Sequence, residues 1–466
     1  LYCWEQVADF INQNEYPQIC QLLSIANNIL SRGAQSEEEC RLANTLMRVL
    51  YALSHLVSDH PEAESLELCC VSMVLHQLEV PRVTDEALKT LIKLIDDRPQ
   101  WLLKREYSDS LIVRCSNLFQ NESLSSKLRL SALKCIGISL SLREPNEIMA
   151  TLQQPLEVYL AGLDGEAVDE IAERKRNFQI GMFSCLFTSL HNKQRPDGES
   201  VILLLRMASP ILLMILEKTN DAQVADRICD AFRCACITLP PSRMAEFFPS
   251  FKSSVTLSLR SNPMAACNLA KSLVFSSAKV LPIEMVTAIE EWARSFDEGF
   301  PYDGMDEYIL LLAQVLKKDW KLLDFVPEKG YCILVSSISL AHKAITASED
   351  PAVVRCASQL LATIVSKISS HDHAIGRKIL EERIDVIVKI VFRRVQIEMI
   401  RQTTDSLAEV LFFFVQSFTT QTRMVVSQEE NGNSPMVSAM FRELGNLRNF
   451  KQMTLRLNHS ARRDCA

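Results

Sequence analysis

The residues best suited to metal binding or redox reactions lie in the stretch RICDAFRCAC, at positions 227–236. Three cysteines, Cys229, Cys234 and Cys236, fall within eight positions, and the carboxylate of Asp230 lies among them. Thiols at this density could bind a metal ion or take part in redox chemistry. They could equally be small apolar residues of a buried helix, because a free cysteine packs as a small hydrophobe.

The spacing of the apolar residues favours the buried helix. Across residues 219–240 they recur at intervals of three, four and one, which is the pattern of a helix with one buried stripe. The stripe comprises Val224, Ala225, Ile228, Cys229, Phe232 and Cys236, with Cys234 near its edge. Asp221 is placed to cap the helix, and Pro240 and Pro241 follow its end. No CxxC pair or nearby histidine completes a zinc site, so we expect core thiols.

Other motifs of catalysis or cofactor binding are missing from the sequence. It has no phosphate-binding glycine loop, no nucleophile elbow and no HExxH pair. His371, Asp372 and His373 could hint at a metal, but they lack a third ligand in sequence, and we expect Asp372 to cap the following helix. The sequence therefore predicts neither an enzyme nor a cofactor.

Composition limits the class of protein further. The 466 residues carry a net charge of −7 and include only 12 glycines, which indicates many helices and few tight turns. The acidity argues against nucleic acid as the main ligand and suits basic partners. Fifteen cysteines without framework spacing indicate reduced thiols in the cytosol or nucleus. We expect no signal peptide and no membrane span, because the longest apolar stretch, 201–216, contains Arg206 and Pro210. A first residue other than methionine indicates a fragment.

The helical pattern around the cysteines recurs along the chain. The stretches SSKLRLSALKCIGISL (125–140) and EDPAVVRCASQLLATIV (349–365) share its arrangement of cap, basic residue and small apolar residues. Helices of this kind start near residues 36, 81, 123, 166, 219, 261, 303, 349 and 397, and each is followed by a second amphipathic helix. Two helices per repeat of roughly 40–47 residues is typical of HEAT or armadillo arrays. We predict an all-α HEAT-repeat solenoid of about nine to ten helix pairs over residues 1–426, with the second helix of each pair on the concave surface.

Polar or strongly charged segments interrupt the array at three places. The stretches DGEAVDEIAERKR (164–176) and SFDEGFPYDGMDEY (295–308) are rich in acids, and SQEENGNSP (427–435) reads as a polar linker before a basic capping helix at 436–466. These segments can be solvated connections, or they can contact partners, since insertions in solenoids often lie on the binding face. The candidate residues for contacts with basic cargo are Asp164, Glu166, Asp169, Glu170, Asp297, Glu298, Asp303, Asp306 and Glu307.

Several stretches resemble one family in particular. They are LANTLMRVLYALSHLVSDHP (42–61), VLHQLEVPRVTDEALKTLIKL (74–94), TNDAQVADRICDAF (219–232), DEYILLLAQVLKKD (306–319) and FKQMTLRL (450–457). In this order they are similar to the C-terminal half of the importin-13 and transportin-3 branch of the importin-β superfamily. The similarity extends from near residue 36 to the end of the chain, although the tail past Arg456 departs from the family's ending.

The resemblance implies a nuclear transport receptor that shuttles between nucleus and cytoplasm. Its expected partners are protein cargo, the GTPase Ran and phenylalanine-glycine nucleoporins, with no nucleic acid and no membrane. The family's main Ran-binding and inner cargo elements lie in N-terminal repeats that this chain lacks, so no functional residue carries over. The alternative is a HEAT-repeat scaffold or regulatory subunit outside transport, which would share every periodicity described above.

Overall fold

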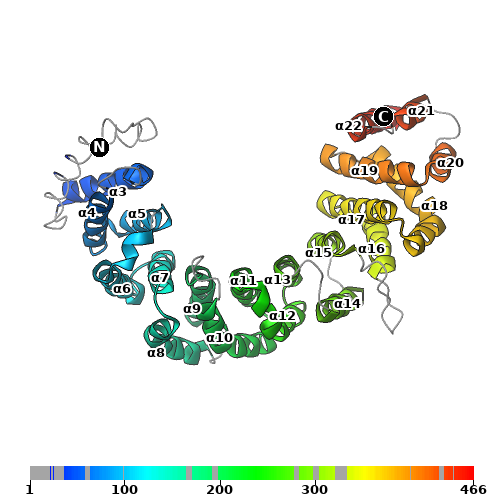
Figure 1. Cartoon of the computed structure of the whole chain (residues 1–466). Coiled ribbons are helices and arrows are strands. Elements are labelled where there is room, and N and C mark those ends of the chain that lie inside the picture. Colours follow the sequence, from blue (N-terminus) through cyan, green and yellow to red (C-terminus); the bar gives the residue numbers. More distant parts are fainter. Residues whose placement is uncertain are drawn as a thin grey trace. The chain divides into compact units, whose positions relative to one another are not determined.

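The structure, a computed structural model, describes most of the chain. The described residues are 36–57, 63–97, 99–163, 170–191, 198–277, 283–297, 304–320, 333–398, 400–429, 435–443 and 446–465, with the single residues 21 and 25. All regular elements among them are helices, and they follow one another as an array of helix pairs (Figure 1).

The helices that the repeat predicts to come first in each pair begin within four residues of their expected starts. They are α3 (Glu37–Val57), α5 (Thr84–Asp97), α7 (Ser126–Ser141), α9 (Glu170–Ser189), α11 (Ala222–Thr238), α13 (Pro263–Ser276), α15 (Met305–Lys318), α17 (Pro351–Ser370) and α19 (Arg401–Ser417). The predicted all-α HEAT-like repeat fold is confirmed.

Within the described residues, an even-numbered helix follows each of these nine helices, and two more helices come after α20. They are α4 (Ala63–Gln77), α6 (Arg105–Gln120), α8 (Pro145–Leu163), α10 (Glu199–Lys218), α12 (Met244–Ser258), α14 (Ile283–Asp297), α16 (Ile333–Ala347), α18 (Ala374–Ile397) and α20 (Thr419–Glu429), followed by α21 (Pro435–Arg442) and α22 (Leu447–Cys465). Two short 3₁₀ turns, η3 (Pro99–Leu103) and η4 (Pro241–Arg243), precede α6 and α12.

Short polar side chains fix the starts of several odd-numbered helices. Asp221 Oδ1 accepts a hydrogen bond from the backbone N–H of Gln223 at 2.7 Å, so the predicted cap of α11 is confirmed. Asn262 and Asp350 cap α13 and α17 in the same way, and each is followed by a proline in the first helical turn. Such caps satisfy donors that have no partner within the helix, and each contributes about 1 kcal/mol. Capping hydrogen bonds therefore help to define where the helices of the repeat begin, in addition to the apolar stripes.

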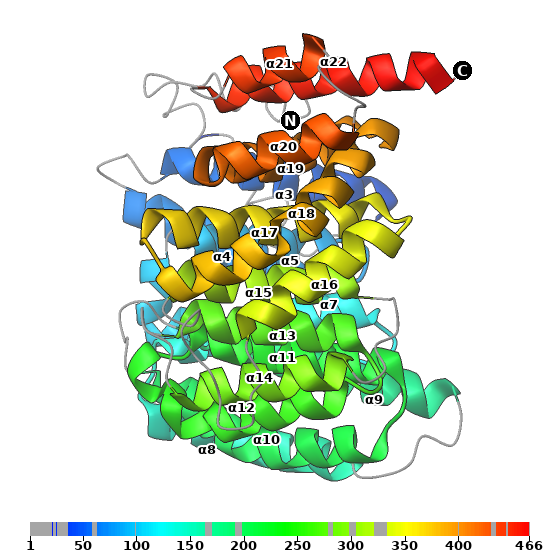
Figure 2. The same cartoon turned by 90° about the vertical axis from the view of Figure 1, so that its right-hand side faces the viewer.

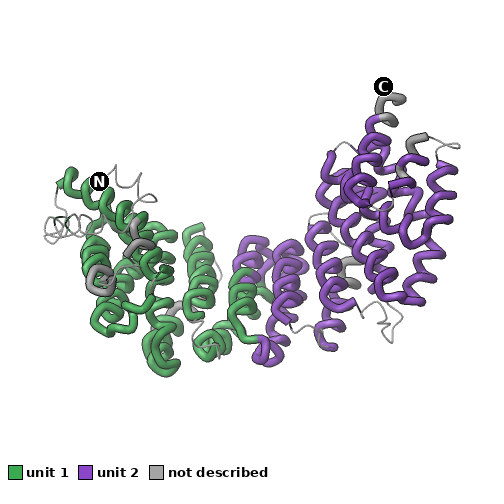
Figure 3. Tube along the Cα trace, turned by 45° about the horizontal axis from the view of Figure 1, so that its top comes forward, with its two compact units in different colours: residues 1–218, 230–240 green, residues 219–229, 241–466 purple. Residues whose placement is uncertain are grey.

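The chain divides into two compact units. Unit 1 comprises residues 1–218 and 230–240, and unit 2 comprises residues 219–229 and 241–466, so the division falls within α11 (Figure 3). In unit 1, α3, α5, α7 and α9 pack side by side in chain order. In unit 2, α13, α15, α17 and α19 do the same, and α22 packs on α19 at the end of the stack (Figure 2).

Within each unit the odd-numbered helices form one layer and the even-numbered helices form the other. The odd-numbered helices lie on the inner side of each unit's curve (Figure 1). The consecutive helices that pack most closely are α4 with α5, α6 with α7, α12 with α13 and α16 with α17, so the pairs begin with an even-numbered helix and are shifted by one helix from the predicted pairing. The second helix of each such pair lies on the inner side, as expected, and it is the predicted start of the pairs that is wrong. The periodicity could not fix where the pairs begin, because every helix buries one apolar stripe and either helix could come first in a pair.

Large buried side chains between the layers hold each unit together. Phe183 and Phe187 of α9 are fully buried in unit 1, as are Phe251 of α12 and Trp292 of α14 in unit 2. The indole N–H of Trp292 donates to Thr256 Oγ1 at 3.1 Å, which satisfies its one polar atom. Burial of such side chains contributes about 1.5–3 kcal/mol each, which makes packing between repeats the main source of stability.

Polar side chains also join successive repeats by bonding to backbone carbonyls. Thr90 Oγ1 donates to the Met47 carbonyl of the preceding first helix at 2.8 Å. Lys318, at the end of α15, donates from Nζ to the carbonyls of Phe275 at 2.9 Å and Ser277 at 2.6 Å, and also to that of Val274. These carbonyls lie at the end of α13, where the last four have no partner within the helix. Lys318 thus caps the neighbouring repeat from outside.

Two described helices, α10 and α17, are long and apolar enough to cross a membrane by length and composition alone. Their most apolar windows have mean hydropathies of 1.9 and 1.2 and are 50% and 61% buried. Helix α17 packs against α15, α16 and α19. A central helix of a solenoid buries most of its circumference, and this accounts for its apolar composition.

The end of the chain differs in detail from the expected linker and single capping helix. Helix α20 continues through Glu429, and the expected tail contains two helices, α21 and α22. Phe450 of α22 is buried with its ring centroid 5.4 Å from that of Phe412. Asn458 of α22 donates to the Glu398 carbonyl just beyond α18 at 2.9 Å. Helix α22 thus covers the last repeat by packing on both α18 and α19.

Candidate functional site

The candidate acidic residues in unit 2 are partly engaged in holding the fold. Asp306 and Glu307 lie in the first turn of α15, where carboxylates are stabilised by the positive end of the helix dipole. Glu307 also forms an ion pair with Lys271 of α13, and the two side chains are only 23% and 17% exposed. Glu307 therefore joins two repeats and offers little charge to a partner, whereas Asp306 remains half-exposed.

Gly304 sets the entry into this acidic turn. Its φ of 89° lies in the left-handed region, and a Cβ there would come within 3.2 Å of the Met264 backbone nitrogen. Gly304 is the N-cap of α15 and has no side chain to cap it. Gly304 is buried and fixes a close approach of α15 to α13.

The other acidic candidates are placed as follows. Glu170 is the first residue of α9, where it pairs with Arg174 at 2.5 Å, and both side chains are about three-quarters exposed. Asp297 is the last residue of α14, so α14 extends into the segment expected to be a loop. The remaining candidates, Asp164, Glu166, Asp169, Glu298 and Asp303, lie outside the described residues. The structure thus brings together only Asp306 and Glu307 among the described candidates.

The cysteines of α11 are core residues, as the stripe predicts. Cys229, Cys234 and Cys236 are 3%, 7% and 0% exposed, and the Cys229 thiol lies 3.1 Å from Ser258 Oγ. Burial raises the pKa of Cys234 to about 11, against the effect of Arg233. A thiol with so high a pKa is a poor nucleophile at neutral pH. Within the described residues, no three side chains of histidine, cysteine, aspartate or glutamate form a group that could hold a metal ion.

The His371-Asp372-His373 stretch forms a helix cap, but through a different residue from the one expected. His373 is the N-cap of α18, and its Nδ1 accepts a hydrogen bond from the Gly376 N–H at 2.8 Å. Asp372, expected to be the cap, has a φ of 48° and makes the turn itself. An aspartate tolerates this left-handed conformation better than most residues, which explains the exchange of roles.

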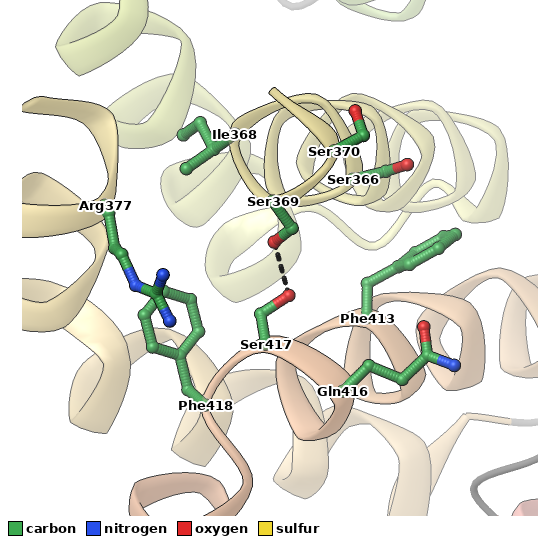
Figure 4. A pocket seen from close by; sticks show the side chains of 9 residues that line it. All are labelled: Ser366, Ile368, Ser369, Ser370, Arg377, Phe413, Gln416, Ser417 and Phe418. Carbon is green, nitrogen blue, oxygen red and sulfur yellow. Dashed lines mark hydrogen bonds between the residues drawn. The ribbon is translucent and has the colours of Figure 1, made fainter. Parts of the chain in front are cut away.

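A hydroxyl-lined pocket lies beside this turn, between the ends of α17 and α19 and the start of α18 (Figure 4). It has a volume of about 430 Å³. Ser369 and Ser417 meet across it at 2.5 Å, and the Arg377 guanidinium lies over the Phe418 ring at 5.8 Å. Arg377 also faces Asp372 and Glu381 at 3.5 and 3.6 Å, so its charge is largely balanced. This balance gives the pocket no clear preference for one sign of charge.

The sequence matches no protein-family model, and it matches no curated protein.

The fold defines a class of protein, the HEAT-like α-solenoids. The chain is similar to importin-13 in its cytosolic state, with a TM-score of 0.82 and 18% sequence identity over 99% of this chain. It also matches importin-β at 13% identity over 99% of the chain, with a TM-score of 0.49 that is too low to add to the argument. At such identities the likeness concerns the fold alone.

The chain is shorter than the two importin structures named above. It spans 54% of the importin-13 chain and 58% of the importin-β chain.

Proposed function

We propose that this chain is the helical-repeat part of a nuclear transport receptor that binds protein cargo and moves it between nucleus and cytoplasm under the control of Ran. The observation that carries the proposal is the likeness to importin-13, which extends over 99% of the chain at a TM-score of 0.82. The same function is what the ordered sequence stretches between residues 42 and 457 predict.

The acidic balance of the chain supports basic cargo. A net charge of −7 favours encounter with positively charged proteins. Because Glu307 is paired with Lys271, the described acidic residues proposed to contact cargo are the exposed Glu170 and the half-exposed Asp306. Asp164, Glu166, Asp169, Asp297, Glu298 and Asp303 remain in the proposal as candidates whose side chains are not described. No catalytic role is proposed for any of them.

A line of exposed apolar residues on α18 supports contact with phenylalanine-glycine repeats. Ile375, Val386 and Ile397 are 62%, 53% and 65% exposed. They are spaced eleven residues apart, which is about three helical turns, so they share one face of the helix. The charged Glu382, Lys389 and Arg393 lie between them on the same face, so the three apolar side chains are proposed as separate points of transient contact with apolar ligands. Phenylalanine side chains in flexible repeats are such ligands.

The alternative is a HEAT-repeat scaffold, and a nuclear entry assay separates the two. The protein expressed from its natural gene, labelled with a fluorophore, is added to permeabilised cells beside an inert protein of equal size. A transport receptor is expected to enter the nuclei and collect at the nuclear rim, because it binds the repeats that fill the pore. Exclusion together with the inert protein would favour the scaffold.

A further inference from the structure

A groove of about 450 Å³ lies between α19 and α22 at the end of unit 2. Helix α22 contributes Leu447, Arg448, Lys451, Gln452 and Leu455, which share one helical face, and α19 contributes Arg401 and Asp405. The groove therefore has apolar walls at Leu447 and Leu455 and cations beside them. This combination differs from the balanced pocket near Arg377.

The two arginines of the groove have no acidic partner among the described residues. Lys451 is paired with Glu409 at 2.9 Å. Arg401 and Arg448 form no ion pair with any carboxylate in the described part of the chain, and both are exposed. The three cations Arg401, Arg448 and Lys451 outnumber the two neighbouring carboxylates of Asp405 and Glu409. The net charge beside the groove is therefore positive, in a chain whose net charge is −7.

Helix stability does not account for these two cations. Arg401 is the first residue of α19, and Arg448 is the second residue of α22. A positive side chain in the first turn is disfavoured by the positive end of the helix dipole. Residues that break a local rule without a compensating contact are often functional. The arginines are therefore better explained by an external anionic partner than by folding.

We propose that the groove between α19 and α22 binds an acidic segment of a protein partner, through Arg401 and Arg448, with apolar side chains of that segment against Leu447 and Leu455. Leu447 and Leu455 are eight residues apart, or about 12 Å along α22, which a short helical or extended segment can span. Charge complementarity selects the acidic segment, because two guanidiniums that have no ion-pair partner in the described part of the chain favour carboxylates. The inference holds whether or not the larger protein is a transport receptor.

The test uses the full chain and a fluorescein-labelled peptide of glutamate and leucine residues. The wild-type chain is expected to bind the peptide, more weakly as salt rises from low to physiological concentration, because exposed charges are screened. The double variant Arg401→Glu/Arg448→Glu should weaken binding at least about tenfold. The matched control, Lys343→Glu/Lys378→Glu, reverses two exposed cations on α16 and α18 and should leave binding within about twofold.

Thermal unfolding keeps the result interpretable if a variant binds poorly. Because acids are favoured in a first helical turn, the double variant should keep or raise the Tm of the wild type. Loss of peptide binding with an unchanged Tm supports the groove. No binding by the wild-type chain, or equal losses in both double variants, would overturn it. Tighter binding of an equally charged oligonucleotide through the same arginines would also overturn it, because the partner would then be a nucleic acid.

Discussion

The carboxylate of Glu307 on α15 forms an ion pair with the ammonium group of Lys271 on α13, and both side chains are mostly buried. The pair joins α13 and α15, which are neighbouring odd-numbered helices of unit 2. A residue that looks like part of an acidic recognition loop in the sequence is thus a contact between repeats in the structure.

We predict that Glu307→Gln lowers the free energy of unfolding by about 1–2 kcal/mol, because it leaves a mostly buried ammonium without its charged partner. The control is Glu170→Gln, which removes one partner of an exposed pair and should change stability by less than about 0.5 kcal/mol. Both are measured by urea unfolding. Equal effects of the two substitutions would show that burial of the Lys271–Glu307 pair has no energetic consequence.

A second prediction concerns the thiols. Burial raises the pKa of Cys185 to about 12 and that of Cys356 to about 11. Because the thiolate is the reactive form, these cysteines and Cys234 should react with a disulfide reagent at pH 8 far more slowly in the native protein than in urea. Mass spectrometry of the labelled peptides measures the rates. Labelling of any of the three at the same rate in native and unfolded protein would contradict the burial described here.

The same shifts predict how stability depends on pH. Below the pKa of an unfolded thiol, about 8.5, the Cys185 thiol is protonated in both states, so its contribution is fully present. As the pH rises towards the folded value of about 12, only the unfolded chain loses this proton, and stability falls. The Tm of the wild type should therefore fall more steeply between pH 8 and pH 10 than that of Cys185→Ala. Parallel curves would mean that the thiol ionises equally in both states.

A further prediction concerns Lys318, which donates hydrogen bonds to the carbonyls at the end of α13. Lys318→Met keeps the aliphatic stem but leaves the carbonyls of Phe275 and Ser277 without their donor, and we expect a loss of about 1–2 kcal/mol. The neighbouring Lys317 is exposed on the same helical turn, so Lys317→Met should be within about 0.5 kcal/mol of the wild type. Amide hydrogen exchange should show faster opening at the end of α13 in Lys318→Met only. Unchanged exchange there would remove the capping role.

The periodic part of the fold was predictable from sequence because it rests on local signals. Asp221, Asn262 and Asp350 mark helix starts by capping, and the apolar stripes define one buried face per helix. These signals require no knowledge of distant residues. The burial of Cys229 and Cys236 follows from the same stripe.

The remaining features depend on contacts between repeats, which a local pattern does not contain. The stripe around Cys229 cannot tell whether its helix comes first or second in a pair. Nothing near Glu307 in sequence indicates Lys271, which lies 36 positions earlier. The cap at His373 depends on the left-handed turn at Asp372, and a signal for it was present in the histidine three residues before Gly376.

The groove residues Arg401 and Arg448 were also missed by sequence reasoning, because they lie 47 positions apart and are brought together only by the packing of α22 on α19. An available signal was the presence of each arginine in the first turn of a helix, where a cation is unfavourable.

The measurement that tests the proposed function most directly is the affinity for Ran in its two nucleotide states. The protein expressed from its natural gene should bind GTP-bound Ran with a Kd below about 1 μM and GDP-bound Ran at least about 100-fold more weakly, a difference of about 2.7 kcal/mol. Equal affinity of the natural protein for both nucleotide states, or no affinity for either, would contradict a Ran-dependent transport receptor. The HEAT-repeat scaffold would then be the function that remains.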